Sequence, residues 1–477
     1  MKKFFSLLLL LVCLTLVSCG GGGNGGGGAN NDILRPDQID KSKPVEVEFY
    51  NAMGQDKQAV IQSIIDRFQA DMKAQYGVDV TVKSVSYGDY DTLRKTIASS
   101  ISANTQPTCA QTYPDHVSLY LEGNAVRSLD DYATDPDYGL EGSEADSYGY
   151  LDKFWAEGRI YDSAKTLYSL PFNKSTELMY YNKTLFEKYS WDVPQTWEQV
   201  IEVAKKWMQT TEYKAVKDKN LKTAGLGIDS EGNAFITLIQ QWGGQYTGFN
   251  ADGEGEFRFV NDEAEAALTW LNEAFKAGYI ATTTHFGTNY CSDAFKAGQC
   301  LMTTGSSAGA SYNIDTKGTF VTGVAPYPQK DLNNKQVIQQ GTNVSLFKCA
   351  DPQEELFGWL FMKYLTSDFE SCKEWTLRTG YFPIRKDVVN DPEYQDYVNQ
   401  ISRDEQGQEH YEYNPINEAV RVGLLQADSF YTSVAFPGTA KAREEGEQVI
   451  KQVLYGDKYD GNVRKALQDA LDRILND

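Results

Sequence analysis

The apolar pattern near the start of the chain changes its period twice between residues 44 and 85. Residues 44–50 alternate and carry β-forming side chains, and residues 78–85 alternate again, as two strands would. Between them, residues 57–76 place apolar side chains at helical spacing. These side chains are Val60, Ile61, Ile64, Ile65, Phe68 and Met72. A strand, a helix and a strand in this order predict a βαβ unit, the start of an α/β lobe.

Strands and helices continue to alternate along the rest of the chain. The pattern predicts strands at residues 108–113 and 225–228, and helices at 91–102, 180–189, 196–209, 234–242, 262–276, 292–297, 352–366, 369–378, 415–427 and, for the most part, 439–474. Thr196 is the expected N-cap of its helix, with Gln199 completing a capping box. No repeat of 20 to 50 residues occurs, which sets the solenoid class aside. The fold class is therefore α/β rather than a helical bundle.

The first 19 residues have the features of a lipoprotein signal peptide. Lys2 and Lys3 precede an apolar run at residues 4–17, which is followed closely by Cys19. A run of about 14 residues is shorter than a membrane-spanning helix needs, so cleavage and lipidation fit it better. We expect residues 1–18 to be removed and Cys19 to carry a lipid that anchors the protein in the cell envelope. An ordinary secretory signal with an incidental cysteine is the alternative.

Residues 20–31 are almost entirely glycine and asparagine, and eight of them are glycine. Such a segment has no apolar area to bury, so we expect residues 19–43 to form a flexible tether after the lipid. A phosphate-binding glycine loop is the alternative, but no predicted strand precedes these glycines and no predicted helix follows them.

The chain is acidic, with 45 Lys and Arg against 66 Asp and Glu and a formal charge of -21; loss of residues 1–18 would make the charge -23. Nucleic acid is therefore not an expected partner. An anionic ligand remains compatible with this charge, because one arginine in a closed cleft can dominate the local potential.

Five cysteines remain once Cys13 in the signal peptide and Cys19 are set aside. They are Cys109, Cys291, Cys300, Cys349 and Cys372. An odd number forbids complete internal pairing, and a disulfide between Cys349 and Cys372 or between Cys291 and Cys300 is open in an exported protein. No CxxC pair or Cys/His cluster occurs, so we expect neither a metal site nor a cofactor.

Two segments carry a resemblance to a known family. Residues 167–182 (LYSLPFNKSTELMYYN) and 194–198 (PQTWE) resemble the part of family 1 extracellular solute-binding proteins of ABC importers where the chain passes the ligand cleft. Similar segments follow in the family's order at residues 49–54, 294–302, 323–328, 341–343 and 379–385. The resemblance implies a two-lobed, type II-like periplasmic-binding-protein fold with the ligand cleft between its lobes.

The resemblance also implies where the chain changes lobe, near Pro171, Gly341 and Tyr381. The lobes would comprise residues 44–171 plus 342–379, and residues 172–341 plus 380–477. Ligand binding would close the lobes by a hinge motion, and the closed form would dock on the permease.

Within the family, residues 111–115, 172–176, 303–307 and 380–381 are most similar to the glycerol-3-phosphate-binding branch. By position, the resemblance implies ligand contacts at or beside Tyr90, Ser175, Ser306, Gly341, Tyr381 and, through a looser alignment, Arg443. Where that branch has a glutamate suited to glycerol hydroxyls, this chain has Pro114 followed by Asp115. Asp115 is the candidate for that role, and a sugar or sugar phosphate becomes the better ligand if it does not take the role over.

Four aromatic residues are further candidates. Tyr50, Tyr90 and Tyr113 lie just after predicted strands, where α/β folds bind ligands. By the resemblance, Trp242 lies where the family places an aromatic ring at the cleft. Flat apolar rings with a polar tip suit polyols and sugars. Core packing is the alternative for each ring. For Arg443 and Ser306 the alternatives are a helix surface and an ordinary glycine-serine loop.

Catalysis is the main competing class of function. The three histidines, His116, His285 and His410, are scattered, and neither a nucleophile elbow nor a metalloprotease motif occurs. We therefore expect a monomeric, lipid-anchored binding protein that delivers a sugar or a glycerol-3-phosphate-like polyol to an ABC permease. A surface lipoprotein of the same fold that acts as an adhesin or sensor partner, or as a receptor for longer glycans, stays open.

Overall fold

The first strand, helix and strand form the βαβ unit that the sequence predicts. β1 (Val45–Asn51) and β2 (Val80–Ser86) are parallel neighbours, and α1 (Gln55–Tyr76) connects them. The six apolar residues that set the helical spacing are the buried residues of α1. The apolar pattern of this segment therefore identified the face of the helix that packs inward.

The computed structural model describes residues 33–404 and 406–476. The signal peptide expected at residues 1–18, the lipid site at Cys19 and the glycine-rich residues 20–31 lie outside the described residues. From residue 34 onward the chain forms one structural unit.

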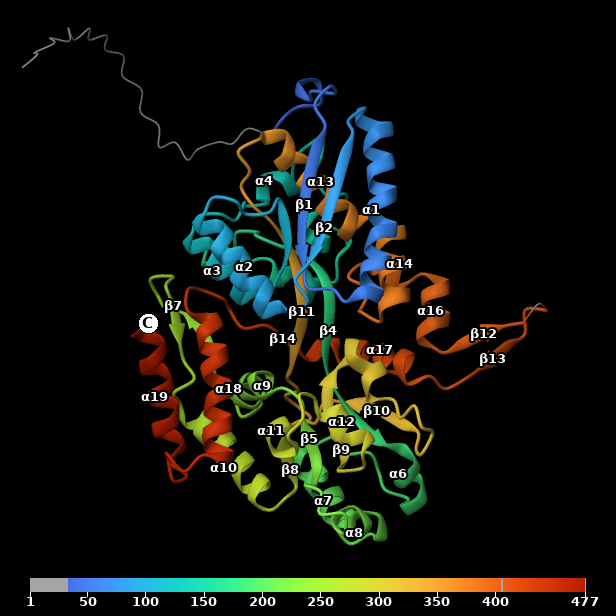
Figure 1. The fold of residues 1–477 in the computed structure, drawn as a ribbon, viewed down its shortest axis with the longest axis vertical. Coiled ribbons are helices and arrows are strands. Elements are labelled where there is room, and N and C mark those ends of the chain that lie inside the picture. Colours follow the sequence, from blue (N-terminus) through green and yellow to red (C-terminus); the bar gives the residue numbers. More distant parts are fainter. Residues whose placement is uncertain (1–32, 405, 477) are drawn as a thin grey trace, which may run out of the picture. The chain divides into compact units, whose positions relative to one another are not determined.

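One path of hydrogen-bonded strands runs through this unit in the order β2-β1-β3-β11-β4-β9-β5-β8 (Figure 1). Besides β1 and β2, this path contains β3 (Cys109–Thr112), β4 (Leu170–Asn182), β5 (Ala224–Ile228), β8 (Ile280–Thr282), β9 (Cys300–Ser306) and β11 (Val337–Leu346). β10 (Thr322–Pro326) pairs with β4, and β14 (Phe430–Tyr431) pairs with β11. The fold is mixed α/β, as the sequence predicts.

β4 joins the two halves of this path. Its residues 170–176 pair with β11, whereas residues 177–181 pair with β9. The strand is buried from Leu170 to Tyr180. β11 makes a second connection, because it pairs with both β4 and β3. The two strands therefore carry the chain between the half that contains β1 to β3 and the half that contains β5, β8 and β9.

Helices surround both halves (Figure 1). The longer ones in the first half are α2 (Tyr90–Ser102), α3 (Pro114–Glu122), α13 (Pro352–Ser367) and α14 (Phe369–Thr379). Those in the second half are α7 (Trp197–Trp207), α9 (Glu231–Gln241), α10 (Asp262–Lys276), α12 (Cys291–Lys296) and α17 (Pro415–Leu425). α18 (Thr439–Tyr455) packs on α9, α10 and α19 (Val463–Leu475), and it also contacts α3 of the first half.

Short elements complete the unit. They are η1 (Pro36–Gln38), α4 (Asp130–Ala133), η2 (Glu144–Gly149), α5 (Asp152–Glu157), α6 (Lys183–Tyr189), α8 (Thr211–Lys217), β6 (Thr247–Phe249), β7 (Gly255–Phe257), α11 (Thr283–Phe286), η3 (Ser307–Asn313), α15 (Lys386–Val389), α16 (Pro392–Val398), β12 (Ile401–Arg403), β13 (Glu409–Tyr411) and η4 (Ala427–Ser429). β12 and β13 form a hairpin that projects beyond α16 (Figure 1).

Two predicted helices start three residues away from their predicted position, because α9 begins at Glu231 rather than Ala234 and α6 begins later than expected. The helix predicted at residues 180–189 starts only at Lys183, because Tyr180 and Tyr181 still pair with β9 and β10 as part of β4. Asn182 ends the strand and caps α6, since its side chain accepts the backbone N–H of Leu185. Residues 439–474 are mainly helical, as predicted, and form the two helices α18 and α19.

All five cysteines in the described part of the chain are free thiols. Burial raises the pKa of each of these thiols above its ordinary value. The two pairings left open by the sequence, Cys349 with Cys372 and Cys291 with Cys300, are not formed among these residues.

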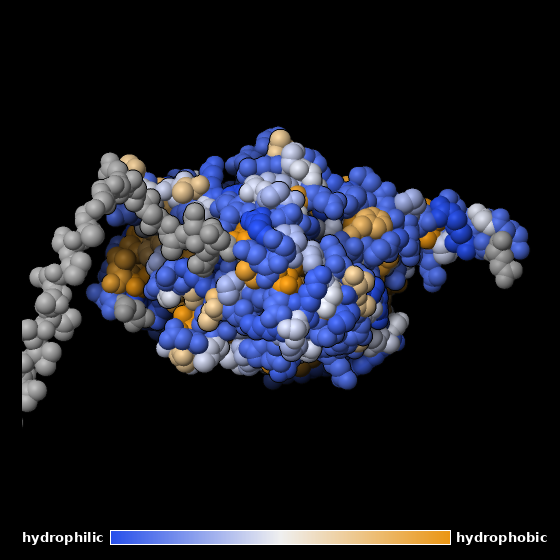
Figure 2. All heavy atoms as spheres, turned by 90° about the horizontal axis from the view of Figure 1, so that it is seen from above, coloured by the Kyte–Doolittle hydropathy of each residue, from blue (hydrophilic) through white to orange (hydrophobic). Residues whose placement is uncertain are grey.

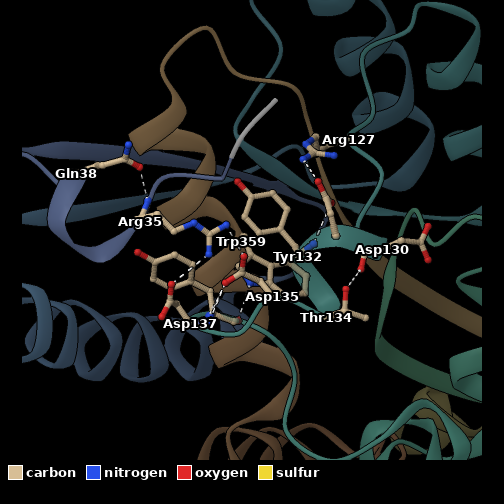
Figure 3. Close-up of polar contacts among 11 residues, drawn as sticks. Arg35, Gln38, Arg127, Asp130, Tyr132, Thr134, Asp135, Asp137 and Trp359 are labelled. Carbon is tan, nitrogen blue, oxygen red and sulfur yellow. Dashed lines mark hydrogen bonds and ion pairs between the residues drawn. The ribbon is translucent and has the colours of Figure 1, made fainter. Parts of the chain in front are cut away.

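Described residues before residue 44, the first residue of the lobe that the sequence suggests, already contact the first half of the unit. Arg35 forms ion pairs with Asp135 at 2.9 Å and Asp137 at 3.1 Å, and Figure 3 shows its side chain reaching toward both carboxylates. The side-chain oxygen of Gln353 accepts the backbone N–H of Asp40 at 2.8 Å. These contacts fix residues 35–40 against the first half of the unit, although the sequence assigns them to the tether.

The face of the molecule seen from above is mainly hydrophilic (Figure 2). Figure 2 shows a face formed largely by hydrophilic residues, with hydrophobic residues in small groups. Within the described residues, no helix is both long enough and apolar enough to cross a membrane.

Candidate functional site

A cavity of about 730 Å³ lies beside the two strands that connect the halves. Ser175 and Glu177 of β4 and Gly341 of β11 line it. The first turns of α2 and α3 contribute from one half, and α9, α12, η3 and α18 contribute from the other elements of the unit. Pockets for small ligands measure about 300–1,000 Å³, so this cavity has the size of a solute site.

Eight of the ten ligand residues suggested by the sequence line this cavity. They are Tyr90, Tyr113, Asp115, Ser175, Ser306, Gly341, Tyr381 and Arg443. They come from segments spread over more than 350 positions of the chain, and the fold gathers them on one cavity.

Tyr50 and Trp242 lie outside this lining and have packing roles. The ring of Tyr50 packs on Tyr87, with centroids 5.0 Å apart, at the edge of the apolar core beside α2 and α3. The ring of Trp242 lies 5.0 Å from that of Trp270, and the Lys330 Nζ lies 5.0 Å from the Trp242 ring centroid. The core-packing alternative therefore describes both rings better than the ligand contact that the sequence suggests.

Three of the tyrosines on the lining are ligand residues that the sequence suggests, namely Tyr90, Tyr113 and Tyr381. The rings of Tyr90 and Tyr113 meet edge to face with centroids 4.9 Å apart, and Tyr381 stacks on Trp375 at 6.2 Å. Burial raises the pKa of all three hydroxyls. The hydroxyls therefore stay protonated and can donate to a ligand, while the ring faces offer apolar surface.

A buried carboxylate that the sequence reading missed lies between the two halves. Glu177 is 3% exposed, and its Oε1 accepts the side-chain N–H groups of Asn233 at 2.7 Å and Gln340 at 2.6 Å. Burial raises the pKa of Glu177 to about 7, although these hydrogen bonds and the charge of Arg443 act in the opposite direction. The carboxyl group is therefore poised between its two protonation states near neutral pH.

Arg443 reaches the cavity from α18. Its Nη2 donates to the side-chain oxygen of Asn233, the same residue that donates to Glu177. With the described residues, Arg443 forms no salt bridge. Most buried or half-buried cations pair with a carboxylate, so a guanidinium without one beside a cavity is suited to an anionic group of a ligand.

Two further carboxylates approach the cavity from opposite sides. Asp115 lies in the first turn of α3, and Asp229 follows β5. The backbone N–H of Cys291 donates to Asp229 at 2.6 Å, yet burial raises the pKa of Asp229 to about 6. Both groups are acceptors for ligand hydroxyls when ionised.

Several polar atoms on the lining lack a hydrogen bond within the described chain. They are the side-chain oxygen and nitrogen of Gln339, the Tyr246 hydroxyl and the side-chain oxygen of Asn313. A buried polar group without a partner costs about 1–3 kcal/mol. A ligand or water that supplies the partners would therefore be stabilised here.

The two serines of the Gly-Ser-Ser segment have different tasks. Ser306 lines the cavity and its Oγ caps the backbone N–H of Ala308 at 3.3 Å. Ser307 is buried, and its Oγ accepts the backbone N–H of Thr176 in β4 at 3.2 Å. One serine thus faces the cavity while the next fixes the connecting strand.

Gly341 is required by the backbone itself. It has φ of 93°, and a Cβ atom there would lie 1.6 Å from the carbonyl oxygen of Asn173 in β4. A side chain at this position would push β11 away from β4. The close approach keeps the two strands in register where both line the cavity.

The lining also contains residues that the sequence did not indicate, among them Lys57, Glu177, Asn233 and Gln340. Lys57, in the first turn of α1, holds its Nζ 5.1 Å from the centroid of the Tyr381 ring. Glu177 carried a weak signal, since it is a charged residue directly before the apolar residues 178–181 in the segment that resembles the family's crossing strand. Lys57, Asn233 and Gln340 can be recognised as lining residues only in the folded structure, where distant segments of the chain meet.

The comparison with protein families identifies the group to which the chain is related. A family model described as bacterial extracellular solute-binding protein matches residues 63–400. The chain belongs to this family. The cavity beside the connecting strands is thus the candidate solute site of an extracellular solute-binding protein.

Curated relatives are similar over most of their length. The sn-glycerol-3-phosphate-binding periplasmic protein UgpB of Pectobacterium atrosepticum is 25% identical over 354 residues, which cover 71% of this chain and 73% of the relative. The protein of the same name from Escherichia coli K12 is 25% identical over 359 residues, covering 71% and 74%.

Solved structures confirm the two-lobed fold of this solute-binding protein. UgpB from Mycobacterium tuberculosis in complex with glycerophosphocholine gives a TM-score of 0.69 at 18% identity, covering 91% of this chain and 98% of that one. The GacH receptor of Streptomyces glaucescens gives 0.67 at 18%, covering 91% and 99%. MalE from Bdellovibrio bacteriovorus bound to maltotriose gives 0.66 at 15%, covering 91% and 100%.

Proposed function

We propose that this protein is the lipid-anchored binding component of an ABC importer, which captures a sugar or a glycerol-3-phosphate-like polyol and delivers it to the permease. The observation that carries the proposal is the guanidinium of Arg443, which lies on a solute-sized cavity without a salt bridge to any described residue. It offers a cation to a ligand beside neutral tyrosine hydroxyls and ionisable carboxylates.

The lining residues have complementary roles in this proposal. Tyr90, Tyr113 and Tyr381 donate hydrogen bonds and cover apolar faces of the ligand. Asp115 accepts ligand hydroxyls, and Arg443 binds an anionic group. Polar contacts from the connecting strands and η3 complete the site, namely Ser175, Ser306 and the backbone of Gly341. Recognition of this kind needs no cofactor and no covalent step.

Closure and delivery follow from the arrangement of the chain. We propose that residues 44–171 plus 342–379 and residues 172–341 plus 380–477 move as two lobes about β4, β11 and the segment at Tyr381. The ligand would stabilise the closed form, because it contacts both lobes and the strands between them. The closed monomer, held at the membrane by lipid on Cys19, would then dock on the permease.

A neutral sugar is the second candidate ligand. Carboxylates outnumber cations on the lining, and two of the similar structures contain acarbose or maltotriose. An adhesin or sensor partner of the same fold is the remaining alternative, and it predicts that no small solute stabilises the protein.

Thermal unfolding tests these candidates. A ligand at a thousandfold excess over its Kd adds about 4 kcal/mol, which corresponds to about 4 °C for a chain of this length. We expect glycerol-3-phosphate or glycerophosphocholine to shift the transition of the wild type and to lose this effect in Arg443→Ala. A shift with maltose alone makes the protein a carbohydrate receptor, and no shift with a broad panel of sugars and phosphate esters contradicts solute capture.

A further inference from the structure

We propose that Glu177 is a specificity-determining ligand residue, and that Asn233 couples it to Arg443 so that the site selects a solute with a hydroxyl donor close to an anionic group. The inference rests on the proposed function and names the chemistry of its ligand. Glu177, Asn233 and Arg443 all line the cavity.

The hydrogen bonds of Glu177 leave one side of its carboxylate for the ligand. Both protein donors, Asn233 and Gln340, bond to Oε1. Within the described chain, Oε2 receives no hydrogen bond, and it belongs to a residue that lines the cavity. Two donors on one oxygen fix the orientation of the carboxylate, so Oε2 is presented in a defined direction.

Asn233 places a cation close to this carboxylate without joining the two. The carboxamide nitrogen donates to Glu177, and the carboxamide oxygen accepts from Arg443. A direct salt bridge would satisfy both charges within the protein. With one carboxamide between them, the carboxylate and the guanidinium each keep capacity for a hydrogen bond or ion pair with a ligand.

Three other buried glutamates of the described chain are held by a cation, although Glu157 among them also lines the cavity; a further one, Glu231, accepts only the hydroxyls of Thr283 at 3.2 Å and Thr284 at 3.5 Å. Glu157 pairs with Lys174, and Glu445 pairs with Arg473 at 2.7 Å. Glu355 accepts from Arg127 at 3.0 Å, and its second oxygen accepts the backbone N–H of Cys349 at 3.2 Å. Glu177 is as buried as these residues but has no direct cation among the described residues. Unlike Glu231, Glu177 lines the cavity, so its Oε2 can accept a hydrogen bond from a ligand.

Calorimetric titration of the full-length protein in detergent tests the inference. The probes are glycerol-3-phosphate, glycerophosphocholine and maltose, and the variants are Glu177→Gln, Asn233→Ala and their combination. Glu187→Gln is the matched control, because Glu187 is an exposed glutamate on α6 with a 68% exposed side chain. Each titration is repeated in two buffers of different ionisation enthalpy, which reports the protons released on binding.

We expect Glu177→Gln to raise the Kd of the phosphate-bearing probe that the wild type binds by roughly ten- to a hundredfold, the loss expected for a hydrogen bond to a charged group. We also expect it to abolish proton release, which a merely structural residue would not do. Asn233→Ala should also raise the Kd. The Kd of the double variant should rise by less than the product of the increases in the two single variants, because both changes disrupt the same hydrogen-bond network.

A Glu177→Gln protein that binds within twofold of the wild type, while Arg443→Ala still abolishes binding, overturns the role of Glu177 and leaves the proposed function standing. Preference of the wild type for maltose over both phosphate-bearing probes overturns the selection for a hydroxyl beside an anionic group. A wild type that binds none of the three probes overturns the proposed function and this inference together.

Discussion

Glu177→Gln is expected to stabilise the ligand-free protein at alkaline pH, although the same change weakens ligand binding. Burial raises the pKa of Glu177 to about 7, from an ordinary value of 4.5. The folded protein therefore binds more protons than the unfolded chain between these two pH values, and its stability falls as the pH rises through this window. Above about pH 7 the full loss of folding stability remains, because the folded protein then holds a buried charge.

The size of the effect follows from the shift. At about 1.4 kcal/mol per pKa unit, a shift of about 2.5 units costs the wild type about 3 kcal/mol at high pH. Glutamine imitates the protonated carboxyl group, since it keeps an acceptor for Asn233 and Gln340 and carries no charge. The stability of the variant relative to the wild type should thus rise by roughly 2–3 kcal/mol between pH 5 and pH 8.

Urea unfolding of both proteins at pH 5, 6, 7 and 8 measures this difference. Asp229, whose pKa is raised to about 6, titrates in both proteins, so its contribution largely cancels in the comparison. Glu187→Gln serves again as the exposed control and should follow the wild type at every pH. A stability difference between Glu177→Gln and the wild type that stays constant within about 0.5 kcal/mol from pH 5 to 8 would refute the reasoning.

Three further perturbations address the strands and the anchor. Gly341→Ala should lower the free energy of unfolding in urea by about 3 kcal/mol or more. Gly243→Ala is the control, because Gly243 has φ of 90° but open space around its Cβ position, and it should lower this free energy by only about 1–2 kcal/mol. Equal losses in the two variants would mean that the close approach of the strands at Gly341 is unimportant. Lys174→Met should destabilise the protein by about 3–5 kcal/mol, because it leaves Glu157 buried without its cation. Adding Glu157→Gln should restore much of this stability. A Lys174→Met protein as stable as the wild type would contradict a tight buried ion pair. Cys19→Ala should release the protein from the membrane fraction and abolish labelling by a fatty-acid analogue, and retention of both would exclude Cys19 as the lipid site.

Local rules account for the elements that were predictable. The capping box of Thr196 and Gln199 forms as expected, because it depends only on residues three positions apart. The helix predicted at residues 262–276 has the same bounds as α10. The region from Tyr180 was misread because its pairing partners in β9 and β10 lie far along the chain. Tertiary pairing there overrides the local preference for a helix.

The residues of the candidate site also fall into those that could be predicted from the sequence and those that could not. Positions such as Tyr381 and Arg443 were accessible because a family resemblance carries information about distant contacts. Asn233 and Gln340 were not, since their hydrogen bonds to Glu177 span 56 and 163 positions of the sequence. Pattern and spacing alone cannot bring such segments together, and each residue by itself reads as an ordinary polar residue on a helix or strand.

β4 explains why solute binding and lobe movement would be coupled in this protein. Side chains alternate along a strand, so Ser175 and Glu177 share one face, which lines the cavity, while Lys174 on the other face pairs with Glu157. The buried ion pair holds the strand in one register, and a slip by one residue would exchange the two faces. A ligand bound by Glu177 therefore acts directly on the segment that joins the lobes. Movement of the proposed lobes would change the position of Glu177 relative to Tyr90 and Asp115, which line the cavity from the first half, so the site would be complete only in a limited range of lobe positions.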